Sequence, residues 1–345
     1  PTSGGTIAAC TPTTTANYIR TTTLRDPVTA EANISTAQRI ETIAYFDGLG
    51  RPVQTVTLQG SPAKNDLVEA VEYDDFGRDY CHLLPFVKAS NNGAYVTDAR
   101  SKAINYYNAT IAGHESTASP WNKTLYEASP LNRTTGTSGP GPWEAKPTSV
   151  SYQTNTSAID HWDAAKNSIT FAAGSLYVTE TTDEDGNKSR EYKDKLGQVV
   201  RRESYDGTAW LRTAYVYDDF GQLIMVVPPK ASLATDTELC YYYSYDQRRR
   251  MTVKDLPGAE PVYMVYDNRD RLALSQDGVQ RPANKWSFTK YDALNRPVMT
   301  GEMVIAATRD NIADQFASYS GAMYEAAGTD LYGYTNQSFP ATYNS

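Results

Sequence analysis

Histidine and cysteine, from which many catalytic and metal sites are built, are scarce in this sequence. Its 345 residues include three of each: His82, His114, His161, Cys10, Cys81 and Cys240. The histidines lie far apart and none has a partner at metal-ligand spacing, so we predict no metal site. The odd number and wide spacing of the cysteines exclude a disulfide framework. One disulfide with a free thiol and three buried thiols both stay open, and we favour the buried thiols.

Basic charge and long apolar runs are also lacking. The formal net charge is −8 and the isoelectric point is near 5.0. Apart from Arg248-Arg249-Arg250, no cluster of lysine or arginine offers a face for phosphate groups, so we expect no nucleic-acid partner. No stretch approaches the roughly 18 apolar residues of a membrane helix, so we expect no membrane-spanning segment.

Motifs for common cofactors and nucleophiles do not occur either. The sequence has no Gly-x-Ser-x-Gly, phosphate-binding loop or dinucleotide fingerprint, so we predict no catalytic residue and no cofactor. The chain starts at Pro1 with neither an initiator methionine nor an apolar signal core. We expect from this start a processed or truncated product whose N-terminal targeting segment has been removed.

Tyrosine, by contrast, is abundant, with 26 residues against 8 phenylalanines and 5 tryptophans. Tyrosine and threonine favour the half-buried, pleated surface of a β-sheet. The composition therefore favours an all-β, extracellular protein.

A short motif recurs along the chain. Tyr73-Asp74-Asp75-Phe76-Gly77 returns unchanged as Tyr217-Asp218-Asp219-Phe220-Gly221. Related segments begin at Phe46, Lys193, Tyr245, Tyr266 and Tyr291. Their aspartates are separated by 27 residues early in the chain and later by 24, 28, 21 and 25. A period of this size indicates a repeat architecture.

The residues of the motif fit a hairpin turn. Aspartate at the first turn position bonds its own backbone two residues on, and two permissive residues follow. The next position requires a left-handed conformation, which suits Gly, then Asn or Asp. The aspartates are Asp47, Asp74, Asp194, Asp218, Asp246, Asp267 and Asp292. The left-handed position holds Gly50, Gly77, Gly197, Gly221, Asp270 and Asn295, and Arg249 alone departs from the preference.

Each repeat is therefore predicted to be one β-hairpin, closed by a type I turn with a bulge. A lone hairpin is barely stable, but stacked hairpins share a continuous sheet. We predict an all-β fold of stacked hairpins with few short helices, of which the one of note covers 308–318 and begins at Thr308. The adjacent carboxylates are turn residues in this interpretation, because a catalytic pair needs a carboxyl with a raised pKa in a dry pocket.

Asp183-Glu184-Asp185-Gly186-Asn187 resembles the start of a calcium-binding loop. Asp194 stands where the distal bidentate glutamate of such a loop is expected. An Asp-Gly hairpin turn explains the segment better.

The motif Tyr-Asp-x-x-Gly-Arg is typical of YD-repeat proteins, the rearrangement-hotspot (Rhs) family. Further segments of the chain resemble the N-terminal domain and first repeats of Bacteroidota-type members. These segments are 44–54, 92–95, 126–133, 182–187, 193–200 and 256–261. The resemblance covers nearly the whole chain.

The resemblance implies a spiralling sheet of hairpins that forms a hollow shell around a C-terminal toxin. In that family a core segment with an Asp-Pro-x-Gly motif acts as an aspartyl autoprotease. Here the only Asp-Pro is Asp26-Pro27, followed by Val28-Thr29, so no protease residue carries over. The expected partners are the remaining C-terminal part of the parent chain and an outer-membrane secretion apparatus. The expected location is secreted or at the cell surface.

We predict four regions along the chain. An extended threonine-rich arm or edge strand covers 1–37, and the first two hairpins cover 38–88. An irregular insertion or small subdomain covers 89–175. Further hairpins cover 176–345, which we expect to stop before the rest of the shell. The leading function is a non-catalytic shell segment, the alternative is a surface adhesin or binding module, and a glycoside hydrolase using paired carboxylates comes third.

Overall fold

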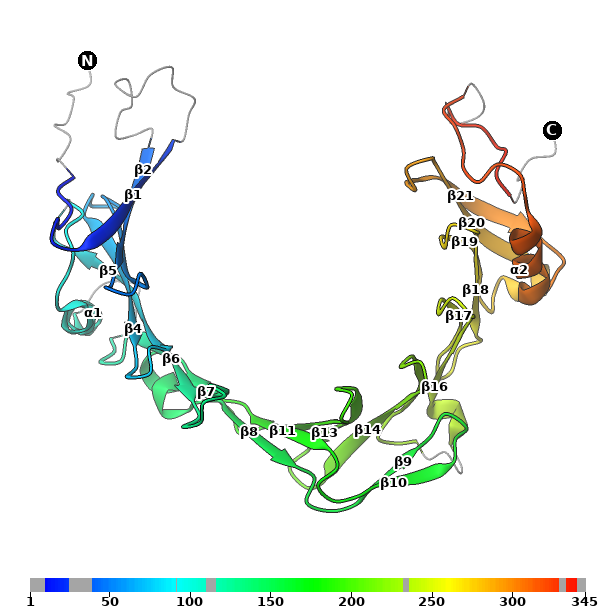
Figure 1. Ribbon diagram of the computed structural model, residues 1–345, viewed down its shortest axis with the longest axis horizontal. Helices are drawn as coiled ribbons and strands as arrows, with labels where there is room; N and C mark the ends of the chain where they lie inside the picture. Colours follow the sequence, from blue (N-terminus) through cyan, green and yellow to red (C-terminus); the bar gives the residue numbers. More distant parts are fainter. Residues whose placement is uncertain are drawn as a thin grey trace. The chain divides into compact units, whose positions relative to one another are not determined.

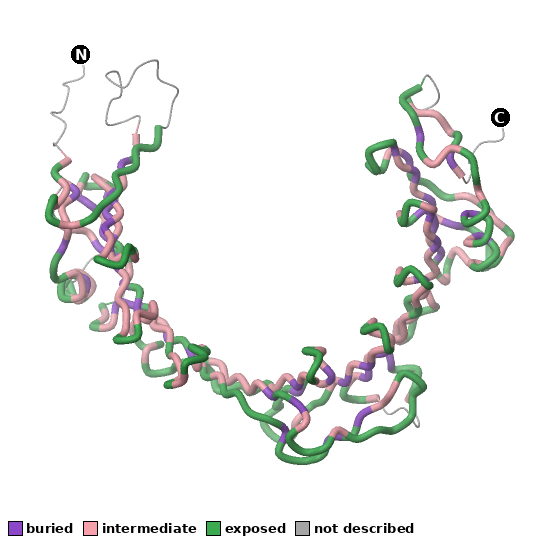
Figure 2. Tube along the Cα trace, viewed as in Figure 1, coloured by how far each residue is buried: buried purple, intermediate pink, exposed green. Residues whose placement is uncertain are grey.

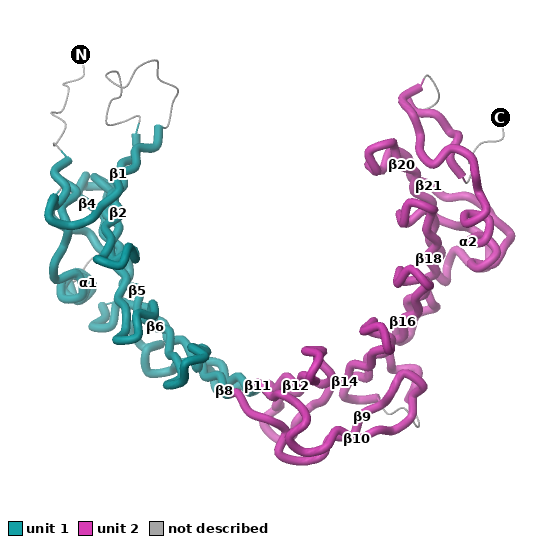
Figure 3. Tube along the Cα trace, viewed as in Figure 1, with its two compact units in different colours: residues 1–151, 180–188 teal, residues 152–179, 189–345 magenta. Residues whose placement is uncertain are grey.

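The computed structural model describes residues 10–24, 39–90, 92–109, 116–231, 236–328 and 333–339 (Figure 1). It contains two compact units, shown in separate colours in Figure 3. The first unit comprises residues 1–151 and 180–188, and the second comprises residues 152–179 and 189–345. No helix in the described ranges is long and apolar enough to cross a membrane.

The first unit is built on a sheet of seven strands whose spatial order follows the sequence. The strands are β1 (Asn17–Leu24), β2 (Arg39–Phe46), β3 (Pro52–Thr57), β4 (Asp66–Tyr73), β5 (Asp79–Lys88), β6 (Trp121–Tyr126) and β7 (Thr134–Ser138). All neighbours in this sheet pair antiparallel. Strand β1 is an edge strand whose residues are all exposed.

The core of the first unit lies on one face of this sheet. Every second residue of β2 is buried, as the period of a strand with one covered face requires. Ile43, Tyr45, Val68 and Phe86 are fully buried there. The helix α1 (Ala99–Asn108) packs on β5 and adds Ala103 to the core.

Helix α1 corrects the prediction of a single helix of note. The side chain of its N-cap residue, Asp98, makes no capping hydrogen bond, and its first turn has no acidic residue. Those are the features that mark a helix start in a sequence. Its formation therefore depends on its packing against β5, which local pattern does not reveal.

The second large sheet has twelve strands in the order β21-β20-β19-β18-β17-β16-β15-β14-β13-β12-β11-β8. Two further strands, β9 and β10, form a separate hairpin. The strands are β8 (Ser149–Thr154), β9 (Ile159–Trp162), β10 (Ser168–Phe171), β11 (Tyr177–Thr182), β12 (Lys188–Lys193), β13 (Val199–Tyr205), β14 (Trp210–Tyr217), β15 (Leu223–Val227), β16 (Tyr241–Tyr245), β17 (Met251–Asp255), β18 (Val262–Tyr266), β19 (Leu272–Gln276), β20 (Lys285–Tyr291) and β21 (Pro297–Val304). Short 3-10 turns are η3 (Gly141–Ala145), η4 (Thr237–Leu239) and η5 (Arg281–Ala283). These antiparallel sheets confirm the predicted all-β fold class.

Several small cores, rather than one large one, stabilise the second unit. The β9–β10 hairpin contributes Ile159 to one cluster, and Trp162 packs against another. A third cluster surrounds Trp286 of β20, which is fully buried. In Figure 2 the buried residues lie along the strands and the exposed ones gather at the turns.

The predicted helix at 308–318 is confirmed as α2 (Arg309–Ser318). Thr308 is its N-cap, and its hydroxyl accepts a hydrogen bond from the backbone N–H of Asn311 at 3.3 Å. Ile312 and Phe316 point into the core around Trp286. The predicted boundaries at 37, 88 and 175 stay a prediction.

Candidate functional site: the latch between hairpins

The aspartate of each motif organises its own turn. In all seven turns the Oδ1 atom accepts backbone N–H bonds from the residues two and four positions ahead. For Asp74 the donors are Phe76 at 3.0 Å and Arg78 at 2.9 Å. Two otherwise unpaired amides of the turn are thereby bonded.

The fourth position of each turn is left-handed. Its φ is 78° at Gly50, 78° at Gly77, 83° at Gly197, 78° at Gly221, 63° at Arg249, 63° at Asp270 and 64° at Asn295. A register shift accompanies every one of these turns. Arg249 thus adopts the conformation that its residue type disfavours. The turn geometry is therefore imposed by the hairpin and does not depend on glycine alone.

Where the motif ends in arginine, that side chain returns to the aspartate. The Nε atom donates to Asp Oδ2 at 2.7 Å in Arg51, Arg78, Arg250 and Arg271, and at 2.6 Å in Arg296. In four of these five arginines the guanidinium also lies over a tyrosine ring at the end of the next hairpin's first strand. The distances to the ring centroid are 4.3 Å for Arg51 over Tyr73, 4.7 Å for Arg78 over Tyr126, 4.8 Å for Arg250 over Tyr266 and 4.7 Å for Arg271 over Tyr291.

In the five motifs that begin with tyrosine, this tyrosine reaches back to the preceding hairpin. Its hydroxyl donates to the backbone carbonyl that directly follows the preceding turn. The bonds are Tyr73 to Pro52 at 2.9 Å, Tyr217 to Val199 at 3.1 Å, Tyr245 to Leu223 at 2.8 Å, Tyr266 to Met251 at 2.9 Å and Tyr291 to Leu272 at 2.9 Å. We call the Asp–Arg pair together with the following tyrosine the latch.

The latch explains why Tyr, Asp and Arg occur together. A hydrogen bond of this kind contributes about 1 kcal/mol and an exposed cation–π contact about 0.5–1 kcal/mol. The turn residues were expected from the sequence, but the contact of arginine with the next tyrosine was not. Its signal was present, since the arginine recurs one position after the left-handed residue.

The latch also sets the charge of its carboxylates. The hydrogen bond from the backbone N–H of Arg51 lowers the pKa of Asp47 below its usual range. Slight burial opposes this shift, and the hydrogen bond from the Arg51 side chain adds to it. The pKa of Asp292 is lowered in the same way by the Arg296 backbone and side chain. A general acid needs the opposite shift. These carboxylates are arranged to stay ionised and to hold the turn.

The histidines do not converge. His82 lies on β5 with its ring nitrogen 2.9 Å from Asp79 Oδ2, and it is exposed. His161 is buried in the β9–β10 hairpin beside Trp162 and Phe171, and burial lowers its pKa to about 4. His114 lies outside the described residues. Across the part of the chain that the structure describes, no three His, Cys, Asp or Glu side chains gather into a group that could hold a metal ion.

The calcium-loop candidate has the geometry of a hairpin turn. Asp183 Oδ1 accepts the N–H groups of Asp185 at 3.0 Å and Asn187 at 2.8 Å, and Gly186 has a φ of 85°. Asp194 organises the following turn instead. All three cysteines are free, with Cys81 and Cys240 buried and Cys10 half-buried.

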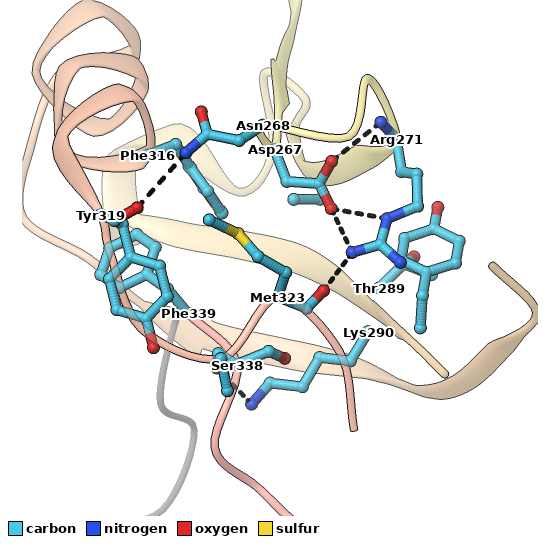
Figure 4. Close-up of a pocket in the computed structure, with 13 residues that line it drawn as sticks. Asp267, Asn268, Arg271, Thr289, Lys290, Phe316, Tyr319, Met323, Ser338 and Phe339 are labelled. Carbon is cyan, nitrogen blue, oxygen red and sulfur yellow. Dashed lines mark hydrogen bonds and ion pairs between the residues drawn. The ribbon is translucent and has the colours of Figure 1, made fainter. Parts of the chain in front are cut away.

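A small cavity of about 10 Å³ lies where the segment after α2 covers β18, β19 and β20 (Figure 4). That volume is about the room that one water needs. Arg271 and Lys290 reach it from the sheet, and Phe316, Met323 and Phe339 reach it from α2 and the segment that follows. Arg271 donates to the Met323 carbonyl, so one latch arginine also holds the C-terminal segment.

The antiparallel hairpin array was compared with known protein families and solved structures. Residues 20–156 match a family described as a domain of unknown function, DUF6443. No curated protein matches the chain. Thirty-seven chains of solved structures do.

The similar structures include crystal structures of TcdB2-TccC3-TEV, at 13% identity and a TM-score of 0.54, and of TcdB2-TccC3, at 14% and 0.53. A third is a Photorhabdus luminescens Tc holotoxin pore, at 12% identity and a TM-score of 0.50. Each match covers 79% of this chain but only 13% of the solved chain. At these identities the likeness shows a shared fold, the β-shell type of the Tc toxins, and this chain spans a small part of such a protein.

Proposed function

We propose that this chain is a non-catalytic wall segment of an Rhs-type toxin or effector of the Bacteroidota kind, which encloses and delivers a C-terminal cargo. The observation that carries the proposal is the latched array: successive hairpins are joined by the tyrosine bond to the preceding hairpin, and four of the turns add an arginine that contacts both its own aspartate and the next tyrosine. The fold likeness to TcdB2-TccC3 supports it.

A latched array suits a wall for a physical reason. Each hairpin is stabilised by its immediate neighbours, so a sheet of this kind extends by repetition without needing a new core. The motif aspartates are committed to turns, and the lowered pKa of Asp47 and of Asp292 keeps those two ionised, which leaves them unsuited to acid–base work. In this proposal the chain is not an enzyme. Its partners are the remaining shell, core and cargo of its parent chain, together with an outer-membrane secretion apparatus. The parent is secreted or displayed at the cell surface.

Protease protection of the cargo tests this function. The full-length parent is expressed, and digestion of its C-terminal domain is compared with that of the isolated domain. The paired variant Arg250→Ala/Arg271→Ala breaks two latches, whereas Arg212→Ala removes an exposed arginine of β14 as the matched control. We expect protection in the parent and the control and faster digestion in the latch variant. Equal digestion of the parent and the isolated domain would refute the enclosure.

A surface adhesin is the second candidate, and one observation favours it. The third position of several turns carries a large apolar side chain that is mostly exposed. These residues are Leu49, Phe76, Leu196, Phe220 and Leu294, with exposed fractions between 67% and 84%. Such side chains offer contact area to another macromolecule. If Phe220→Ser abolishes attachment of the parent to cells while cargo protection is unchanged, adhesion is the better assignment.

A further inference from the structure

A buried cluster of polar side chains joins β20 to the segment after α2. Lys290 of β20 and Glu325 form an ion pair at 3.1 Å, and their side chains are 1% and 0% exposed. The Lys290 ammonium also donates to the carbonyl of Ser338 at 2.9 Å and to Oδ1 of the Asn336 carboxamide. An amine, a carboxylate and a carboxamide therefore meet inside the protein.

Stability alone is a weak explanation for this cluster. Removing two charges from water costs several kcal/mol, and apolar residues of similar volume often stabilise a core equally well. The surroundings are apolar on one side, where Phe316, Met323 and Phe339 line the adjoining cavity (Figure 4). A dry site of this kind lowers the cost of moving a proton within an ion pair, because it penalises the charged forms.

Glu325 is held rigidly between its neighbours. Its Oε1 accepts from the Ser338 backbone at 3.0 Å and from the Ser338 hydroxyl, in addition to Lys290. Its Oε2 accepts from the Thr335 hydroxyl at 2.8 Å and from the Gln337 backbone at 2.9 Å. The carboxylate thus organises the backbone on both sides of Asn336 and places that carboxamide against the amine.

We propose that Lys290 and Asn336 form an intramolecular isopeptide bond, with Glu325 as the group that transfers the proton. The Lys290 ammonium gives a proton to the Glu325 carboxylate, and the resulting amine attacks Cγ of Asn336. The bond between Cγ and the amide nitrogen of Asn336 then breaks. The departing NH2 group takes up the proton from Glu325 and a second proton from the attacking nitrogen, and it leaves as an ammonium ion. The products are a Lys290–Asn336 amide, an ammonium ion and the restored carboxylate.

The environment of the amine suits this step. Burial lowers the pKa of Lys290, and the pairing with Glu325 offsets only part of that shift. The lowered pKa makes the neutral, nucleophilic amine easier to form. Glu325 lies within hydrogen-bonding distance of the proton it would accept. Burial raises the pKa of Glu325, but its hydrogen bonds outweigh burial and lower that pKa overall, so Glu325 holds the proton only in passing and gives it up to the leaving group. Contact between the reacting groups supplies the proximity that makes an intramolecular reaction fast.

The bond would fasten the end of the array. Lys290 and Asn336 lie 46 positions apart, and the closed loop would contain β21 and α2. A covalent link across this loop restricts the unfolded chain, as a disulfide does. The segment that covers the sheet beside α2 would then be unable to detach without breaking a covalent bond.

The intact mass of the purified chain tests the proposal directly. We expect a mass lower than that of the sequence by one ammonia. We also expect a branched tryptic peptide that joins the Lys290 segment to the Asn336 segment. A mass equal to that of the sequence would overturn the proposal, and so would a loss of water, which would place the bond on Glu325 instead. This measurement on the unaltered chain decides the question even if a variant fails to fold.

Variants assign the roles. Lys290→Ala and Asn336→Ala should each have the full mass of their sequence. Glu325→Gln keeps the shape but removes the proton acceptor, so it should also keep the full mass. Lys285→Arg is the matched control, because Lys285 lies on the same strand and pairs with Glu302 at the surface at 3.1 Å. The Lys285→Arg chain should show the same loss of ammonia as the parent chain. If the parent loses ammonia and the Lys285→Arg chain does not, Lys285 is the reacting amine and the proposal is wrong.

Discussion

Alanine at Gly48 and alanine at Gly50 should change stability in opposite directions, although both residues lie in one turn. Gly50 has a φ of 78°, whereas the φ of Gly48 lies outside the left-handed range. A Cβ atom added at either glycine meets no atom within 4 Å. Steric clash therefore contributes to neither variant, and the sign of φ is the difference that remains.

The size of the effect follows from two contributions. Replacing glycine with alanine at a compatible position stabilises a protein by about 0.4–1 kcal/mol, because it restricts the unfolded chain. A left-handed conformation costs a residue with a Cβ roughly 1–2 kcal/mol. Gly48→Ala should therefore gain about 0.4–1 kcal/mol, and Gly50→Ala should lose up to about 1.6 kcal/mol. Both variants share the unfolded-chain contribution, so their difference isolates the left-handed cost.

Urea unfolding followed by tryptophan fluorescence measures this difference, with the transition of the first unit compared between the variants. Gly50→Val adds β-branching and should unfold at lower urea than Gly50→Ala. Equal midpoints for Gly48→Ala and Gly50→Ala, or a Gly50→Ala chain more stable than the parent, would refute the turn geometry on which the latch depends.

Three further changes test other parts of the structure. Asp218→Ala should cost about 1–2 kcal/mol because it removes the acceptor of two turn amides, whereas Asp219→Ala at the exposed neighbour should stay within about 0.5 kcal/mol by the same urea assay. Tyr266→Phe should lower stability by about 1 kcal/mol through loss of its bond to Met251, and Tyr177→Phe at a position 61% exposed should change little. The buried His161, with a pKa of about 4, stays neutral in the folded state while the unfolded chain gains a proton below about pH 6.5, so stability should fall by up to about 3 kcal/mol between pH 6.5 and 4. His161→Phe should flatten that slope in urea melts recorded at each pH, and an unchanged slope would assign it to other groups.

The hairpins could be predicted from sequence because their determinants act within five residues of one another. Asp74 bonds amides two and four positions ahead, and Gly77 supplies the left-handed residue between them. The same locality made α2 predictable, since Thr308 caps it three residues before the bonded amide. Short-range chemistry of this kind leaves a visible pattern.

Longer-range features left no such pattern. Helix α1 has no capping hydrogen bond from its N-cap residue Asp98, and it packs on β5. The contacts of Lys290 with Glu325 and Asn336 span 35 and 46 residues. Alternation with Trp286 and Phe288 places Lys290 on the covered face of its strand, but nothing in the sequence indicates its partners. The division into two units is equally invisible, because the motifs at 73–78 and 217–222 have nearly the same sequence although they belong to different units.

The latch has a direction along the chain, and this matters while the protein is being made. Each tyrosine hydroxyl bonds to a carbonyl that lies 15 to 22 residues earlier, so the acceptor leaves the ribosome before its donor. Hairpins can therefore settle one after another during translation, and such near-neighbour contacts favour rapid folding. The same locality affects evolution, because gain or loss of one whole hairpin leaves the side chains needed to rejoin its neighbours. A protein built in this way can change its length in single-repeat steps without redesign of a central core.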